Sequence, residues 1–134
     1  MILIDTSVWI EFFRQNEPFS SQVSTLLAEQ KVITVEPVFS ELMFGVITAQ
    51  EKSVIKTFWQ ILPRIEFSAD SMFEASSFPF QNNSQELKIG LIDTVIINSA
   101  KKGGHLLWTL DERIISIMDH SQLFHQTSEL DRYP

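Results

Sequence analysis

The sequence predicts one α/β domain with three layers, in which helices cover both faces of a mainly parallel sheet of four or five strands. Short apolar runs of strand length alternate with longer stretches in which apolar residues recur at helical spacing. The runs 1–4 and 105–109 show no alternation of polar and apolar residues, which is typical of strands buried on both faces. With 134 residues, 44% of them hydrophobic, and with eleven Phe and three Trp, the chain can bury a core of its own.

The first half of the chain is expected to contain two strands and four helices. Asp5 follows the first strand, and Thr6 or Ser7 can cap the helix that comes next. Pro37 is well placed in the first turn of a helix, and Pro63 ends another. In chain order the elements are strand 1–4, the helix after Asp5, a turn at 15–18, helix 19–30, strand 32–35, a helix through 37–46 and helix 50–62.

The second half continues the alternation. Gly103 and Gly104 end a helix just before a buried strand, and the segment 79–85 (PFQNNSQ) is the most loop-like part of the chain. The expected elements are strand 64–67, helices 70–78 and 91–102, strand 105–109, helix 112–118 and an edge strand at 123–125. We therefore expect a single domain over 1–125, followed by a polar tail over 126–134.

Four acidic residues stand at points that this topology brings to one edge of the sheet. Asp5 and Asp111 come after buried strands, whereas Glu41 and Asp93 lie on apolar helices. Ligands of open α/β sheets bind at the carboxyl ends of the strands. A single Asp after a strand more often shapes a turn or caps a helix, so the four acids support a functional site only as a group.

Composition narrows the chemistry of such a site. The net charge of −7 argues against a broad basic surface for nucleic acid, although without these four acids thirteen acidic residues face ten basic ones, a balance of −3. The absence of Cys and the scatter of three His exclude the usual zinc motifs, so a metal ion would need oxygen ligands, which select Mg²⁺ or Mn²⁺. Two such ions about 3.5–4 Å apart can hydrolyse a phosphodiester. No apolar run has the length of a membrane span and no signal peptide is visible, so we expect a cytoplasmic protein.

Four segments together resemble a known family: ILIDTSVWI, SELMFGV, GLIDTVIINSA and LLWTLDERI. Over nearly the whole chain the sequence resembles the PIN-domain ribonucleases, in particular the VapC-type toxins of toxin–antitoxin pairs. The resemblance implies a three-layer PIN-like fold and a metal-dependent endoribonuclease that hydrolyses RNA with Mg²⁺ or Mn²⁺. It also implies an antitoxin of VapB type as partner and pairing into a homodimer, for which aromatic residues such as Phe44 and Trp59 would be core or interface.

The resemblance also assigns roles. Asp5 and Asp93 match the principal metal ligands of the family, Glu41 a ligand or a group that orients water, and Asp111 a ligand that acts partly through water. Two hydroxyl residues match the family as well, one beside the first acid and one two residues before the fourth: Thr6 and Thr109.

Other classes of protein fit less well. A phosphatase of the haloacid dehalogenase type needs a second acid two residues after the first, where this chain has Ser7, and a receiver domain needs paired acids that are absent. The alternative that stays open is a catalytically silent PIN-like binding module that acts through RNA or protein contacts. Five basic residues are either phosphate contacts or ordinary surface charges: Arg14, Lys88, Lys101, Lys102 and Arg113.

Overall fold

The sheet has three parallel strands in the order β2-β1-β3. The computed structural model describes residues 1–77 and 89–124, and within them the strands are β1 (Ile2–Ile4), β2 (Val32–Ile33) and β3 (Leu106–Trp108). Ile2 pairs with Val32 on one side and with Leu106 on the other, so β1 is the central strand. It is buried along its whole length, as its unbroken apolar run predicts.

The sheet is narrower than the four or five strands that the sequence predicts. The two further strands are each reduced to a single parallel bridge in the described residues, between Thr34 and Arg64 and between Leu107 and Leu123. At the first bridge the N–H of Thr34 donates to the carbonyl of Pro63 at 3.0 Å and the N–H of Ile65 to the carbonyl of Thr34 at 2.7 Å, and at the second the N–H of Phe124 donates to the carbonyl of Leu107 at 2.9 Å. The α/β class and the parallel order of the sheet are confirmed, and the described residues form three strands rather than four or five.

Every α-helix that lies within the described residues is where the sequence predicts one, with ends shifted by a few residues, whereas the 3-10 helix at 120–122 was not predicted. Thr48 caps α4 through the amide of Glu51, and Gly104 ends α6 in a left-handed conformation with φ of 68°. The elements are α1 (Thr6–Phe13), α2 (Phe19–Ala28), α3 (Glu36–Gly45), α4 (Ala49–Ile61), α5 (Ser71–Ser76), α6 (Leu91–Gly103), α7 (Glu112–Ile117) and the 3-10 helix η1 (His120–Gln122). The expected loop 79–85, Lys88, His125 of the edge strand and the tail 126–134 lie outside the described residues.

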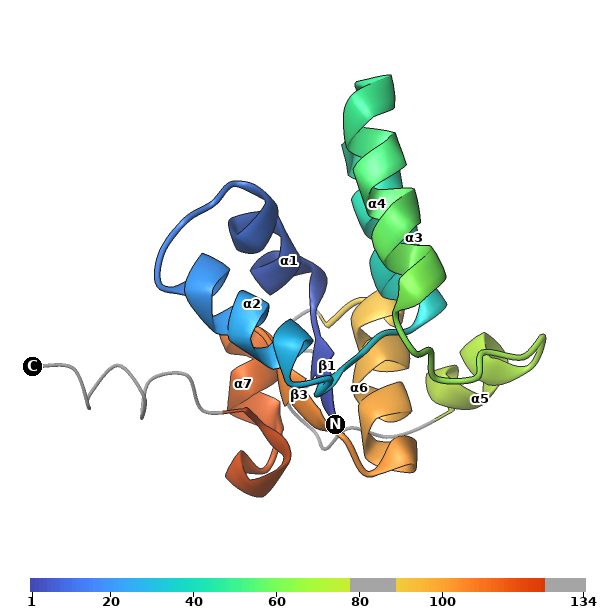
Figure 1. Cartoon of the computed structure of the whole chain (residues 1–134). Helices are drawn as coiled ribbons and strands as arrows, with labels where there is room; N and C mark the ends of the chain where they lie inside the picture. The colour runs from blue at the N-terminus through green and yellow to red at the C-terminus, as the bar shows by residue number, and fades with distance from the viewer. Residues whose placement is uncertain (78–88, 125–134) are drawn as a thin grey trace, which may run out of the picture.

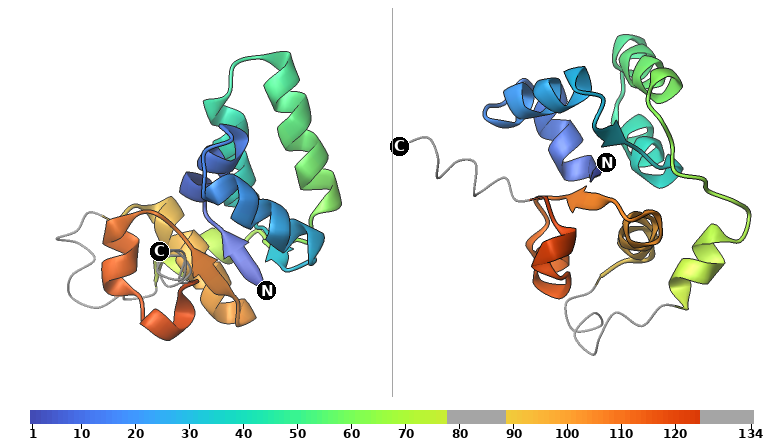
Figure 2. Two further views of the ribbon diagram at one scale, coloured as in Figure 1. Left: turned by 60° about the vertical axis from the view of Figure 1, so that its left-hand side comes forward. Right: turned by 60° about the horizontal axis from the view of Figure 1, so that its bottom comes forward.

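The helices form layers on the two sides of the sheet. Helices α1 and α2 lie on one side, while α6 and α7 lie on the other (Figure 2). Helices α3 and α4 form a hairpin that projects from the body of the domain (Figure 1). Within the described parts of the chain, no helix combines the length and the apolar character that crossing a membrane requires.

Aromatic side chains fix α1 against this hairpin. The ring of Trp9, which has no exposed surface, lies 5.4 Å from that of Phe39 and 5.8 Å from that of Phe58, measured between centroids. Phe12 and Phe13 complete the cluster at 5.6 and 5.7 Å from Trp9. Edge-to-face and stacked rings at these separations are favourable contacts. The cluster therefore holds α3 beside the first residues of α1, where β1 has just ended.

Candidate active site

Asp5 stands at the carboxyl end of β1 and is only 6% exposed. Its Oδ2 accepts hydrogen bonds from Thr109 Oγ1 at 2.7 Å and from Ser7 Oγ at 3.1 Å. Although Asp5 occupies the N-cap position of α1, its side chain makes no capping hydrogen bond. The interpretation of Asp5 as a mere helix cap is therefore wrong, because its carboxylate points toward the end of β3 instead.

Thr6 connects the first acid to the second. Its hydroxyl donates to Glu41 Oε1 at 2.8 Å, joining the first turn of α1 to the middle of α3. This bond orients the Glu41 carboxylate toward Asp5. Burial is the main cause that raises the pKa of Glu41, and the nearby negative charges of Asp5 and Asp93 raise it further.

The third and fourth acids face each other across Arg113. Asp93 lies in the first turn of α6, and Asp111 is the N-cap of α7, where it accepts from the backbone N–H of Arg113 at 2.9 Å. The Arg113 guanidinium donates to Asp111 Oδ1 through Nε at 3.1 Å and to Oδ2 through Nη2 at 2.7 Å. The same Nη2 lies 3.9 Å from Asp93 Oδ2. Asp111 is thus both a helix cap and a member of the acidic group.

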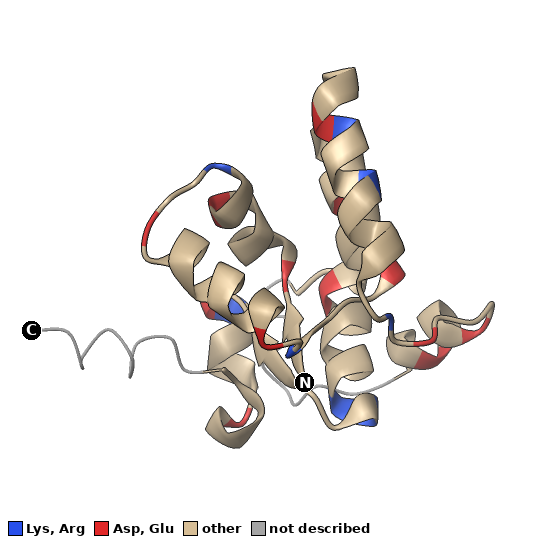
Figure 3. Ribbon diagram, viewed as in Figure 1, with Lys and Arg blue, Asp and Glu red and all other residues tan. Residues whose placement is uncertain are grey.

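The four carboxylates act on one another electrostatically. Burial raises the pKa of Asp5 and of Asp93, and a neighbouring carboxylate adds to the rise in each case, Asp93 for Asp5 and Asp111 for Asp93. The pKa of Asp111 is lowered instead, chiefly by the hydrogen bonds from the Arg113 side chain. Each of the four acids thus has at least one of the others as an electrostatic neighbour, and we call these four residues the acidic cluster; Arg113 compensates mainly Asp111. Figure 3 shows acidic positions where β1 leads into α1 and at the upper end of α6.

The donor set of this cluster consists of oxygen atoms, which hard divalent cations such as Mg²⁺ and Mn²⁺ prefer. In the ranges 1–77 and 89–124, however, no three acidic or histidine side chains stand close enough to form a metal cage as they are. Asp5 Oδ2 is held by two hydroxyls, and each oxygen of Asp111 accepts from Arg113. The oxygen donors are of the kind that binds such an ion. Arg113, however, lies between Asp93 and Asp111, so the side chains would have to turn before an ion could bind.

Sequence reasoning missed two contributors to this cluster. Ser7 donates to Asp5 and its Oγ accepts from the backbone N–H of Leu110 at 3.1 Å, so it ties the end of β1 to the chain after β3. Its position two residues after the first acid was the available signal. Arg113, expected as an RNA contact or a surface charge, is instead bound to the fourth acid. An Arg two residues after Asp111 at a helix start could have indicated this pairing.

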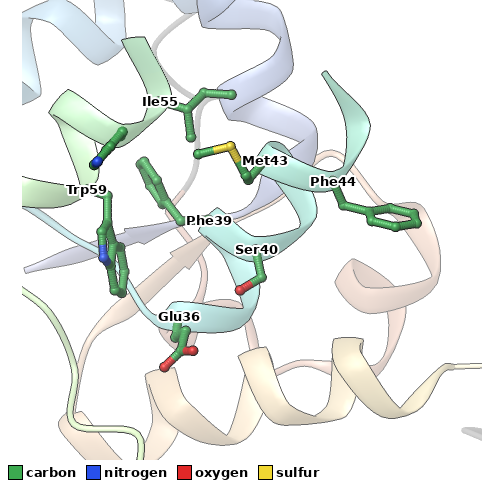
Figure 4. A pocket seen from close by; sticks show the side chains of 8 residues that line it. Glu36, Phe39, Ser40, Met43, Phe44, Ile55 and Trp59 are labelled. Atoms are coloured by element: carbon green, nitrogen blue, oxygen red, sulfur yellow. The ribbon is translucent and has the colours of Figure 1, made fainter. Parts of the chain in front are cut away.

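A second feature lies away from the acids. A groove of about 390 Å³ runs between α3 and α4, and Figure 4 shows Phe39, Met43, Ile55 and Trp59 pointing toward one another there. Its remaining lining residues are Glu36, Ser40, Phe44 and Lys56. None of the four acids lines it, so this mainly apolar groove is separate from the acidic cluster.

Comparisons with known proteins agree with this geometry. Among the similar solved structures is VapBC2 from Rickettsia felis bound to a DNA fragment from their promoter, with a TM-score of 0.67, 20% identity, and coverage of 92% of this chain and 96% of that one. FitAcB from Neisseria gonorrhoeae has a TM-score of 0.60 and 20% identity, and the match covers 87% of this chain and 92% of that one. FitAB bound to the IR36 DNA fragment has a TM-score of 0.58 and 16% identity, and the match covers 94% of this chain and 99% of that one.

At such identities the likeness shows the fold. A search of curated proteins finds no significant match. The family model of the PIN domain, by contrast, matches residues 2–119, which is most of the chain. On that match the chain belongs to the PIN-domain family.

Proposed function

We propose that this PIN domain is a metal-dependent endoribonuclease that acts as the toxin of a toxin–antitoxin pair. One observation supports the proposal: acids from four parts of the chain influence one another in pairs near the carboxyl end of β1, and burial together with a neighbouring carboxylate raises the pKa values of three of them. Converging acids are costly to a fold, since each opposes the ionisation of its neighbours. Proteins keep such an unfavourable arrangement at sites where the acids bind a cation.

In this proposal the side chains of the acidic site have different roles. Asp5 and Asp93 would hold Mg²⁺ or Mn²⁺, with Asp111 joining them, and Thr109 and Ser7 keep the Asp5 carboxylate in position. When bound, the ion supplies positive charge that lowers the pKa of water and stabilises the leaving oxygen of a phosphodiester. Glu41, oriented by Thr6, is placed to accept a proton from the attacking water. The resemblance to the PIN-domain ribonucleases implies that this hydrolysis leaves a 5′-phosphate and a 3′-hydroxyl.

We propose that the partner is an antitoxin of VapB type and that the two proteins bind each other in the cytoplasm. Two large apolar side chains, Phe44 near the end of α3 and Ile47 just after it, are 93% and 89% exposed, and apolar side chains exposed this close together favour contact with another protein. Phe44 is therefore not part of the core, unlike Phe39. We further propose that the chain pairs into a homodimer. A segment of the partner that covers the acids should carry Arg or Lys, because a cation there compensates the carboxylates.

The alternative, a binding module without catalysis, is favoured by one observation. In the described part of the chain no three acids form a metal cage as they stand. A chain of this kind would bind RNA or protein through the PIN fold and leave RNA intact whatever ion is supplied.

Cleavage of RNA distinguishes the two functions. The purified chain should cut RNA in Mg²⁺ or Mn²⁺, stop in EDTA and resume when the ion is restored. Expression of the chain alone should be toxic, and co-expression of an antitoxin of VapB type should relieve the toxicity. An intact RNA in every metal condition, together with harmless expression, would favour the binding module.

A further inference from the structure

The guanidinium of Arg113 occupies the space between the third and fourth acids. It donates to both oxygens of Asp111, at 3.1 and 2.7 Å, and lies 3.9 Å from Asp93 Oδ2. A bidentate pair of this kind has fixed geometry and is stronger than a single hydrogen bond between neutral groups. In the structure, both oxygens of Asp111 are therefore bound by a cation of the chain itself, the guanidinium of Arg113.

Capping of α7 does not require this cation. The cap is the bond from the backbone N–H of Arg113 to Asp111 Oδ1 at 2.9 Å, and it would persist with another side chain at position 113. The Arg113 side chain is 48% exposed, and ion pairs at such exposure add little to stability. The position of this charge beside Asp93 therefore indicates a role in the acidic site rather than in stability.

We propose that Arg113 is a resident counter-cation of the acidic site, which competes with a divalent ion for Asp111 and leaves that carboxylate when the ion binds. This inference rests on the proposed function, since it concerns the ion that the function uses. Arg113 compensates the acids while no ion is present. For the same reason it opposes the entry of the ion, both by its positive charge and by occupying the oxygens of Asp111.

The direct test is a calorimetric titration of the whole chain with Mn²⁺ after treatment with EDTA and dialysis. Four proteins are compared: the parent, Arg113→Gln, Arg113→Lys and Lys102→Gln. Lys102 is a matched control because it also pairs with a carboxylate, Glu74, at 2.8 Å, but about 13 Å from Asp93 along the axis of α6. Removing the charge at position 113 should tighten Mn²⁺ binding about tenfold. Lysine keeps the charge without the bidentate geometry and should lie between, whereas Lys102→Gln should match the parent.

The outcomes separate this inference from the proposed function. Mn²⁺ binding that is equal or weaker in Arg113→Gln than in the parent overturns the inference alone. A parent that binds no Mn²⁺ overturns the metal-dependent function, and the inference with it. Far-ultraviolet circular dichroism of each variant shows whether it is folded, and Arg113→Lys provides the comparison if the glutamine variant is not.

A second measurement follows Arg113 in the parent protein itself and uses the variants only to assign its signal. The Nε–H signal of Arg113 in a nitrogen–proton NMR spectrum is assigned by its absence from the two variants at position 113. Saturation with Mg²⁺ should move this signal toward those of arginines exposed to water, because the bond from Nε to Asp111 Oδ1 is lost. A signal that stays in place at saturating Mg²⁺ would mean that Arg113 remains on Asp111, and the inference would be wrong.

Discussion

Thr109 Oγ1 donates a hydrogen bond to Asp5 Oδ2 at 2.7 Å, joining two buried residues that are 104 positions apart in the sequence. The same hydroxyl oxygen accepts from the backbone N–H of Asp111 at 3.1 Å. One side chain thus positions the first acid and the backbone of the fourth. The parallel pairing of β1 with β3 makes this possible, because it brings the ends of both strands to the same edge.

Replacing Thr109 with Val should damage both stability and cleavage. The methyl group keeps the shape of the side chain, but the Asp5 carboxylate loses its shorter hydrogen bond and the Asp111 N–H loses its acceptor. Leaving buried polar groups without a partner costs about 1–3 kcal/mol in unfolding free energy. Denaturant unfolding of Thr109→Val and Thr109→Ser measures this. Serine keeps the hydroxyl, so a serine variant as unstable as the valine variant would show that packing, rather than the hydrogen bond, is what Thr109 supplies.

Asp93→Asn should make the metal-free protein more stable at neutral and alkaline pH. Burial and the charge of Asp111 raise the pKa of Asp93 in the folded state, so the folded protein binds more protons than the unfolded one above the ordinary aspartate pKa of about 3.9. Stability is therefore lost as pH rises through this window, and asparagine removes the loss.

Melting curves with and without Mn²⁺, at about pH 5 and about pH 8, check this sign. The gain in Asp93→Asn should be larger at the higher pH. Added Mn²⁺ at a hundred times its dissociation constant should stabilise the parent by about 2.7 kcal/mol and the variant by less. A metal-free variant less stable than the parent at both pH values would identify Asp93 as a structural residue of the first turn of α6.

Asp111→Asn should have the opposite effect on the metal-free protein. The hydrogen bonds from Arg113 lower the pKa of Asp111 in the folded state, so its ionised form stabilises the fold above the ordinary aspartate pKa. This contribution is lost as pH falls through the lowered pKa of the folded state. Asparagine caps a helix about as well as aspartate does, so the substitution removes the charge while the cap remains. Because the pair is partly exposed, a slightly lower melting temperature than the parent at neutral pH, with a difference that fades toward strongly acidic pH, is the expected result; a clearly higher one would contradict the pairing with Arg113.

The sequence carries the parts of the fold and site that depend on local pattern. The apolar run before Asp5, the turns and the helical spacing around Glu41 and Asp93 were enough to predict the α/β class and the grouping of the acids, because parallel strands place their ends at one edge. They also predicted strands at 64–67 and 123–125, whereas among the described residues of these two ranges only Arg64 and Leu123 form a bridge with the sheet. Strand propensity alone does not show whether a neighbouring strand is within reach.

The contacts that tune the site depend on geometry between distant segments. The bond from Thr109 to Asp5 spans 104 residues, and the pairing of Arg113 with Asp111 depends on side-chain rotamers at the start of α7. Spacing in the sequence indicated Thr109 only through the resemblance to the PIN-domain family. Asp111 is both the cap of α7 and the partner of Arg113, and the only signal of that pairing in the sequence was the spacing of two residues between them.

Cleavage of an end-labelled RNA in Mn²⁺ by the parent, Asp5→Asn and Lys102→Gln tests the central claim most directly. Asp5 is the most buried of the four acids and the one that the structure orients with two hydroxyls, whereas Lys102 pairs with Glu74 near the far end of α6. We expect Lys102→Gln to cleave like the parent and Asp5→Asn, with its fold confirmed by a melting curve, to be slower by at least about a hundredfold, since several kcal/mol of transition-state stabilisation depend on the bound ion. Cleavage by Asp5→Asn at the rate of the parent would contradict the claim that these carboxylates form the catalytic site.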